Sequence, residues 1–124
     1  MLAILMQLMP RTAKLLSKNK MTRRQLLNPT NNIKYGTRYL GMLLNKNEGN
    51  QVLATAAYNA GHYRVKTWLP KKVSMPADIW IETIPYKETR DYVKAVLAYQ
   101  QIYANRLGES SDLFSRLASM QITP

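Results

Sequence analysis

The sequence contains no cysteine, and histidine and phenylalanine each occur only once. Without cysteine the chain has no disulfide, no thiolate metal ligand and no cysteine nucleophile. The single histidine, His62, has no carboxylate near it in the sequence at metal-ligand spacing. We therefore predict no metal site and no cofactor, and we place His62 at the surface.

Acidic residues are also scarce. The chain has 7 Asp and Glu residues against 18 Lys and Arg residues, which gives a formal net charge of +11. Such a charge attracts polyanions, including nucleic acid, anionic lipid and cell-wall polymers. The basic residues are spread along the chain, which is typical of solvated helix faces. Because neither a helix-turn-helix signature nor a basic-aromatic platform is evident, nucleic-acid binding is the remote alternative, and we predict no specific nucleic-acid partner.

Long apolar runs are absent too. No segment approaches the roughly 20 apolar residues of a membrane-spanning helix. The apolar opening, MLAILMQLMP, lacks a basic lead-in and a small-residue cleavage site, and Pro10 interrupts it. We do not interpret it as a signal peptide. We therefore expect no membrane span, and a cytoplasmic location if the chain is expressed as written.

What the sequence does contain is helical periodicity. With 124 residues and 46% hydrophobic content, the chain fits one domain with a sizeable core. Alternation of β-branched residues, which would indicate a sheet, is missing, so the predicted fold class is all-α. The predicted helical segments are residues 10–18, 29–46, 52–61, 65–69, 77–84, 85–108 and 112–120.

Local signals mark several helix ends. Asn28 before Pro29 is a cap followed by a first-turn proline, Gly61 and Gly108 are stop signals, and Ser110 or Ser111 precedes the last helix. Two faces are predicted from spacing, one in residues 29–46 and one in residues 85–108. Their members are Ile33, Thr37, Leu40 and Leu44 in the first, and Tyr92, Val96, Tyr99 and Tyr103 in the second. We predict that the tyrosine stripe is buried and that Gly36 and Gly41 permit close helix contact.

Three blocks carry a family resemblance. They are MQLMPRTA at 6–13, AAYNAG at 56–61 with RVKTWL at 64–69, and IETIPYKETRDYVKAVLAY at 81–99. In order and spacing they resemble the catalytic domain of soluble lytic murein transglycosylases. The resemblance implies a lysozyme-like helical domain, truncated at its N-terminus. Residues 1–108 would form the partial transglycosylase domain, and residues 109–124 a short C-terminal helix and tail.

The family cleaves the β-1,4 bond between MurNAc and GlcNAc in peptidoglycan without hydrolysis, leaving 1,6-anhydroMurNAc. That chemistry needs one carboxylic acid held neutral by an apolar pocket. In the family this acid lies one helix before the block at 6–13, which is upstream of Met1. We therefore expect no catalytic residue and an inactive chain. The alternative is a noncatalytic peptidoglycan-binding module, or one completed by a second chain that supplies the missing helix.

The resemblance also implies five substrate-binding residues, each with an alternative. Gln7 would hold a sugar acetamide, and Met9 would pack on a sugar face or fill the core. Tyr58 would point its hydroxyl at the catalytic acid, or be a core tyrosine. Asn59 would bind substrate or cap a helix. Glu82 would line the groove or form an ion pair at a helix end.

The remaining candidates are assigned structural roles. Trp68 and Trp80 fall on apolar stripes, which favours core packing over sugar stacking. The other acidic residues are predicted at the surface, namely Glu48, Asp78, Glu88, Asp91, Glu109 and Asp112. The expected partners are peptidoglycan glycan strands, and the family resemblance implies the periplasm.

Overall fold

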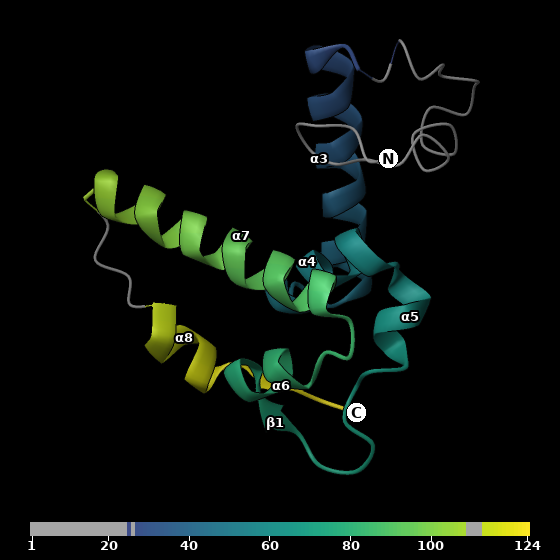
Figure 1. The fold of residues 1–124 in the computed structure, drawn as a ribbon, viewed down its shortest axis with the longest axis vertical. Helices are drawn as coiled ribbons and strands as arrows, with labels where there is room; N and C mark the ends of the chain where they lie inside the picture. The colour runs from purple at the N-terminus through teal and green to yellow at the C-terminus, as the bar shows by residue number, and fades with distance from the viewer. Residues whose placement is uncertain (1–24, 26, 109–112) are drawn as a thin grey trace. The chain divides into compact units, whose positions relative to one another are not determined.

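The computed structural model describes residue 25, residues 27–108 and residues 113–124 (Figure 1). The chain divides into two compact units, Met1–Gly49 and Asn50–Pro124, and each is treated by itself. The predicted helix at 10–18 and the candidate residues Gln7 and Met9 lie outside the described residues. Helices dominate both units, as the all-α prediction requires.

In the first unit the predicted helix at 29–46 is confirmed as α3, Pro29–Lys46. The side-chain oxygen of Asn28 accepts hydrogen bonds from the backbone N–H groups of Thr30, at 3.0 Å, and Asn31, at 3.4 Å. These amides have no partner inside the helix, so the cap stabilises its first turn. Pro29 follows at the position where its missing N–H costs nothing.

The face of α3 identified from the spacing is not the buried face. Ile33 is 51% exposed and Thr37 is exposed as well. The buried residues of this helix are Asn32, Gly36 and Leu43. The true face is displaced by one residue, or about 100° of helix rotation, because a polar and a glycine position carry no apolar signal. Gly36 is buried, which is compatible with the predicted close contact, whereas Gly41 is exposed and a Cβ atom there would have no neighbouring atom within 4 Å.

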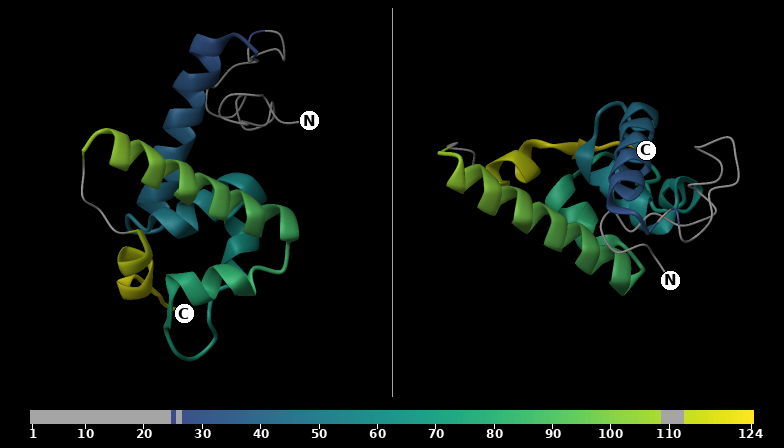
Figure 2. Two further views of the ribbon diagram at one scale, coloured as in Figure 1. Left: turned by 60° about the vertical axis from the view of Figure 1, so that its left-hand side comes forward. Right: turned by 90° about the horizontal axis from the view of Figure 1, so that it is seen from above.

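The second unit holds the remaining described helices and a small sheet (Figures 1 and 2). Within it α4 contacts α5 and α7, and α6 contacts α7 and α8. The helices are α4, Gln51–Ala60; α5, His62–Lys66; α6, Ala77–Thr83; α7, Lys87–Arg106; and α8, Leu113–Ser119. The predicted last helix is thus present, while its proposed caps Ser110 and Ser111 lie outside the described residues.

The sheet was not predicted. Strand β1, Met75–Pro76, pairs antiparallel with β2, Gln121–Ile122, and Met75 faces Ile122 in the register. Next to this pairing the N–H of Ala77 donates to the carbonyl of Met120 at 2.8 Å. Strands of two residues are too short to show alternation in a sequence, which explains the missed prediction.

Helix α4 is thoroughly buried, as predicted. Its small side chains allow neighbouring helices to approach closely, because the distance between helix axes depends on the side chains at the contact. The buried residues are Val52, Ala54, Thr55, Ala56 and Ala57. Gly61 ends this helix and begins α5, with a φ of 99° that L side chains rarely adopt.

The predicted buried stripe of α7 is also wrong. Tyr99 is 64% exposed and Tyr103 is 66% exposed. The buried residues are Thr89, Val93 and Leu97, again displaced by about one position. The predicted face and the buried face of α7 both have helical spacing. The buried face carries the smaller side chains, which fit inside the fold, whereas tyrosines are amphipathic and tolerate exposure. The predicted stop at Gly108, with φ 75°, is confirmed.

Trp80 lies in the core of this unit, as predicted. It is fully buried, and its indole Nε1 donates a 2.9 Å hydrogen bond to the backbone carbonyl of Trp68. A buried indole N–H needs such a partner. Trp68 is itself half-buried, and its ring packs edge-on against Tyr86 with 5.1 Å between centroids. The hydrogen bond from Trp80 to Trp68 therefore ties α6 to the segment that follows α5.

Candidate functional site

Asn59 lies in the last turn of α4, and its side chain bridges two helices. Its oxygen accepts a 2.7 Å hydrogen bond from the hydroxyl of Thr89 on α7. Thr89 is 1% exposed, so the bond is shielded from water. The end of α4 is capped by Gly61, whose N–H donates to Ala57. The side chain of Asn59 therefore holds α4 against α7, and its proposed contact with substrate stays a prediction.

Tyr58 precedes Asn59 on the same turn. Its side chain is half-buried and its hydroxyl oxygen is buried. A phenol in such a place has an apolar ring packed in the fold and a polar tip in a fixed position. That arrangement suits the positioning of a substrate or an acid, and the assignment of Tyr58 to the groove remains a prediction.

Glu82 lies near the end of α6 and forms an ion pair across to α7. Its Oε1 lies 2.5 Å from Nζ of Lys94, and the two side chains are 62% and 47% exposed. The helix-end ion pair considered from the sequence is thus present. An exposed pair of this kind contributes only about 0–1 kcal/mol. Its carboxylate stays accessible to a ligand, so the groove assignment remains a prediction.

None of the described carboxylates resembles a general acid. A carboxylic acid that is neutral at pH 7 has its pKa raised by an apolar, water-poor surrounding. The described acidic residues are all exposed, namely Glu48, Asp78, Glu82, Glu88 and Asp91. The pKa of Asp91 is lowered, which is the opposite of what a general acid needs, because Lys87 donates a 2.7 Å hydrogen bond to its carboxylate. Glu109 and Asp112 lie outside the described residues.

The same part of the chain offers neither a metal site nor a membrane-spanning helix. Residues 25, 27–108 and 113–124 include no group of three or more His, Asp or Glu side chains arranged to hold a metal ion. In that part of the chain no helix combines the length and apolar character needed to cross a membrane. His62 is half-buried, so its predicted surface position is only partly correct. Its ring packs edge-on against Tyr63 with 5.8 Å between centroids.

A second group of side chains, around Tyr86, was not predicted from the sequence. The guanidinium of Arg64 on α5 lies 5.0 Å from the ring centroid of Tyr86, the same ring that Trp68 contacts. The spacing of four residues between Arg64 and Trp68 could have indicated a shared helical face. Their common partner, Tyr86, lies too far along the chain for spacing to reveal it.

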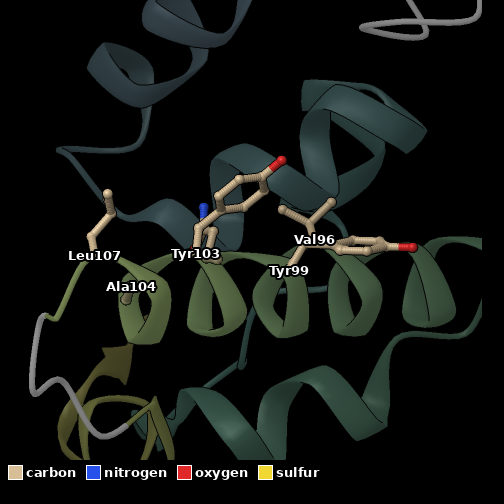
Figure 3. Close-up of a pocket in the computed structure, with 6 residues that line it drawn as sticks. Val96, Tyr99, Tyr103, Ala104 and Leu107 are labelled. Carbon is tan, nitrogen blue, oxygen red and sulfur yellow. The ribbon is translucent and has the colours of Figure 1, made fainter.

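The exposed face of α7 forms a shallow apolar pocket of about 430 Å³. Figure 3 shows that its labelled side chains all come from α7 and from Leu107 directly after it. The lining residues are Val96, Tyr99, Gln100, Tyr103, Ala104 and Leu107. No acid or base lines the pocket, so we do not place chemistry there.

Two family profiles match the chain in sequence. The family described as Transglycosylase SLT domain matches residues 4–81, which is more than half of the chain. The family described as Soluble lytic transglycosylase helical domain matches residues 83–112. A curated relative, the soluble lytic murein transglycosylase of Salmonella typhimurium, is 45% identical over 92 residues, covering 73% of this chain and 14% of the relative.

Solved structures agree with this match. An inactive mutant of lytic transglycosylase Slt from Pseudomonas aeruginosa superposes with a TM-score of 0.77 and 44% identity, over 86% of this chain and 18% of that one. The 70-kDa soluble lytic transglycosylase of Escherichia coli gives a TM-score of 0.77 and 39% identity over the same shares. The chain thus spans less than a fifth of the length of either protein. The predicted lysozyme-like helical fold is confirmed.

Proposed function

Since the chain belongs to the soluble lytic transglycosylase family, we propose that it binds the glycan strands of peptidoglycan, the polymer that this family cleaves. The family reaction breaks the β-1,4 bond between MurNAc and GlcNAc and closes a 1,6-anhydro ring. Within that function we assign this chain the groove that holds the sugars, and we propose that it does not cleave them by itself. The corresponding compartment is the periplasm.

The observation that supports the groove is the way its candidate residues are fixed to α7. Asn59 is hydrogen-bonded to Thr89, and Glu82 is paired with Lys94. Those two α7 positions are separated by about 7.5 Å along the helix axis, at 1.5 Å per residue. The ends of α4 and α6 are therefore both anchored on the first half of α7. Tyr58, next to Asn59, is held in the same arrangement.

The proposed lack of turnover rests on the described carboxylates. Protonation of the glycosidic oxygen requires a neutral acid within hydrogen-bonding distance. Every described carboxylate is exposed, so none lies in the apolar pocket that such an acid needs. The described groove side chains can bind sugar hydroxyls through Glu82 and the tyrosine phenol, but they include no carboxyl group buried in an apolar pocket. Gln7 and Met9, which lie outside the described residues, complete the proposed set of sugar contacts.

Incubation of the purified chain with intact sacculi tests this proposal. We expect the protein to sediment with the sacculi and to release no 1,6-anhydromuramyl product detectable by mass spectrometry. Glu82→Gln and Tyr58→Phe should each weaken sedimentation, whereas Glu88→Gln, which changes an exposed carboxylate outside the proposed groove, should not. Release of anhydro products would refute the assignment as noncatalytic, and absence of sedimentation would refute the groove.

The partner-completed module is a second candidate, and the α7 pocket favours it. Exposed apolar side chains such as Tyr99, Tyr103 and Leu107 are typical of a surface that another segment covers. Analytical ultracentrifugation with thermal unfolding tests this candidate. A single monomeric species that melts cooperatively would count against it.

Nucleic-acid binding rests on net charge alone, and a DNA mobility-shift series at rising salt would reveal generic attraction.

A further inference from the structure

Arg64 is held on an aromatic surface built from two distant chain segments. Its guanidinium carbon lies 5.0 Å from the centroid of Tyr86, which precedes α7. Trp68 supports the same tyrosine from another side, and the carbonyl of Trp68 is fixed by the buried indole of Trp80. Arg64 is exposed and Tyr86 is 43% exposed, so this arrangement faces solvent.

Stacking on a ring leaves the binding edge of a guanidinium available. The N–H donors of arginine lie in the plane of the group, and they match the two oxygens of a carboxylate. The ion pairs found among the described residues are Lys87 with Asp91 and Lys94 with Glu82. Neither involves Arg64. Its guanidinium therefore lies over an aromatic ring and has no ion-pair partner among the described residues.

The chain segment that contains Arg64 is basic. Residues 62–76 contain four basic side chains and no acidic one, namely Arg64, Lys66, Lys71 and Lys72. Residues 77–91, which follow directly, contain four acidic side chains, Asp78, Glu82, Glu88 and Asp91. Charges act over about 8 Å at physiological salt. The segment around Arg64 is thus a local positive region beside a mixed one, and it draws anions toward the guanidinium.

We propose that Arg64, stacked on Tyr86, binds the free carboxylates of the peptide stems that project from peptidoglycan glycan strands. The inference rests on the proposed function, because the stem peptides are part of the strand that this unit is proposed to hold. A carboxylate is the planar anion that the guanidinium edge fits, and the wall polymer itself carries it. Lys66, Lys71 and Lys72 provide attraction without fixed geometry.

The experiment compares two ligands that differ only in charge. One is a set of soluble glycan fragments bearing stem peptides, and the other is the same set after conversion of the carboxyl groups to amides. Calorimetry with the full chain should show about tenfold tighter binding of the unmodified fragments, the size expected for a charge-assisted hydrogen-bonded pair. Arg64→Ala should abolish the difference. Arg64→Lys should restore part of it, because lysine keeps the charge and loses the planar pair of donors.

Arg38→Ala is the matched control. Arg38 is also an exposed arginine over a tyrosine, at 5.1 Å from the ring of Tyr35 on α3, and its removal should leave the tenfold difference unchanged.

Wild-type affinity in Arg64→Ala for unmodified fragments would overturn the inference while leaving the proposed function intact. Equal loss for both ligands would overturn it too, since Arg64 would then only support the fold. If the wild-type chain binds neither ligand, the proposed function fails and the inference fails with it. Equal weakening of DNA binding by Arg64→Ala would show a nonspecific polyanion surface instead.

Discussion

The hydroxyl of Thr89 donates a 2.7 Å hydrogen bond to the side-chain oxygen of Asn59, and the two residues are 30 positions apart in the chain. The bond crosses from α7 to α4 beside Tyr58. A polar contact at a buried threonine gives the two helices a specific alignment, because an unpaired group there would be costly. The proposed sugar groove therefore depends on a bond that itself need not touch sugar.

Thr89→Val should remove this bond while keeping the shape of the side chain. We expect a loss of about 1–3 kcal/mol in the free energy of unfolding, because Asn59 then lacks its donor. Urea denaturation followed by circular dichroism measures it. Thr83→Val is the control, since the hydroxyl of Thr83 bonds only to the carbonyl of Trp80 in its own turn and the residue is exposed. A similar loss in both variants would contradict the interpretation.

The two glycines Gly61 and Gly41 should respond in opposite directions to alanine. Gly61 has φ 99° and ψ 143°, so Gly61→Ala should destabilise by about 1–3 kcal/mol through backbone strain. Gly41 lies within α3, and Gly41→Ala should stabilise by about 0.5–1 kcal/mol. Both positions have open space for a methyl group, so crowding does not contribute. Thermal midpoints compare the two, and a stabilised Gly61→Ala variant would refute the prediction.

Trp80→Phe should separate the hydrogen bond of Trp80 from its bulk. Phenylalanine fills most of the fully buried site but leaves the carbonyl of Trp68 without the indole donor. We expect a loss of about 1–3 kcal/mol from the unmade bond, with some contribution from reduced packing. Guanidinium unfolding monitored by circular dichroism provides the measurement. A change below the experimental error would show that the bond to Trp68 is not stabilising.

Acid should weaken the ion pair between Lys87 and Asp91. The pKa of Asp91 lies below its usual value of 3.8 because Lys87 donates a hydrogen bond to it. A carboxylate with a lowered folded-state pKa adds stability above its unfolded pKa, and this is lost as the pH falls through the folded value. The stability difference between the wild type and Asp91→Asn should therefore be small at pH 7 and vanish as the pH falls below the lowered pKa of Asp91. An NMR titration that places the carboxyl at or above 3.8 would contradict this, and 1 M salt should reduce the difference at pH 7.

Local chemistry made the helix ends predictable. Asn28, Gly61 and Gly108 act within one turn of their own position, so a single sequence contains the whole signal. The buried faces depend on what packs against each helix. For α3 and α7 the apolar pattern was compatible with two faces about 100° apart, and only the folded partners select one.

The candidate site was predictable to a similar extent. The family resemblance located Tyr58, Asn59 and Glu82, and the structure places them at the ends of α4 and α6. It did not reveal the partners Thr89 and Lys94, because contacts between residues far apart in sequence leave no periodic signal. The contact of Arg64 with the ring of Tyr86 was not predicted for the same reason.

The short pairing between β1 and β2 has a consequence for how the chain is made. The first amide of α6, at Ala77, receives its acceptor from Met120, and Met75 is covered by pairing with Ile122. Ribosomes deliver residues in order, at about 5–20 per second, so this contact waits until everything up to Ile122 has been synthesised. Contacts of such long sequence separation form slowly. During synthesis the start of α6 therefore lacks these two partners until the end of the chain has been made, although α7 is available to it earlier.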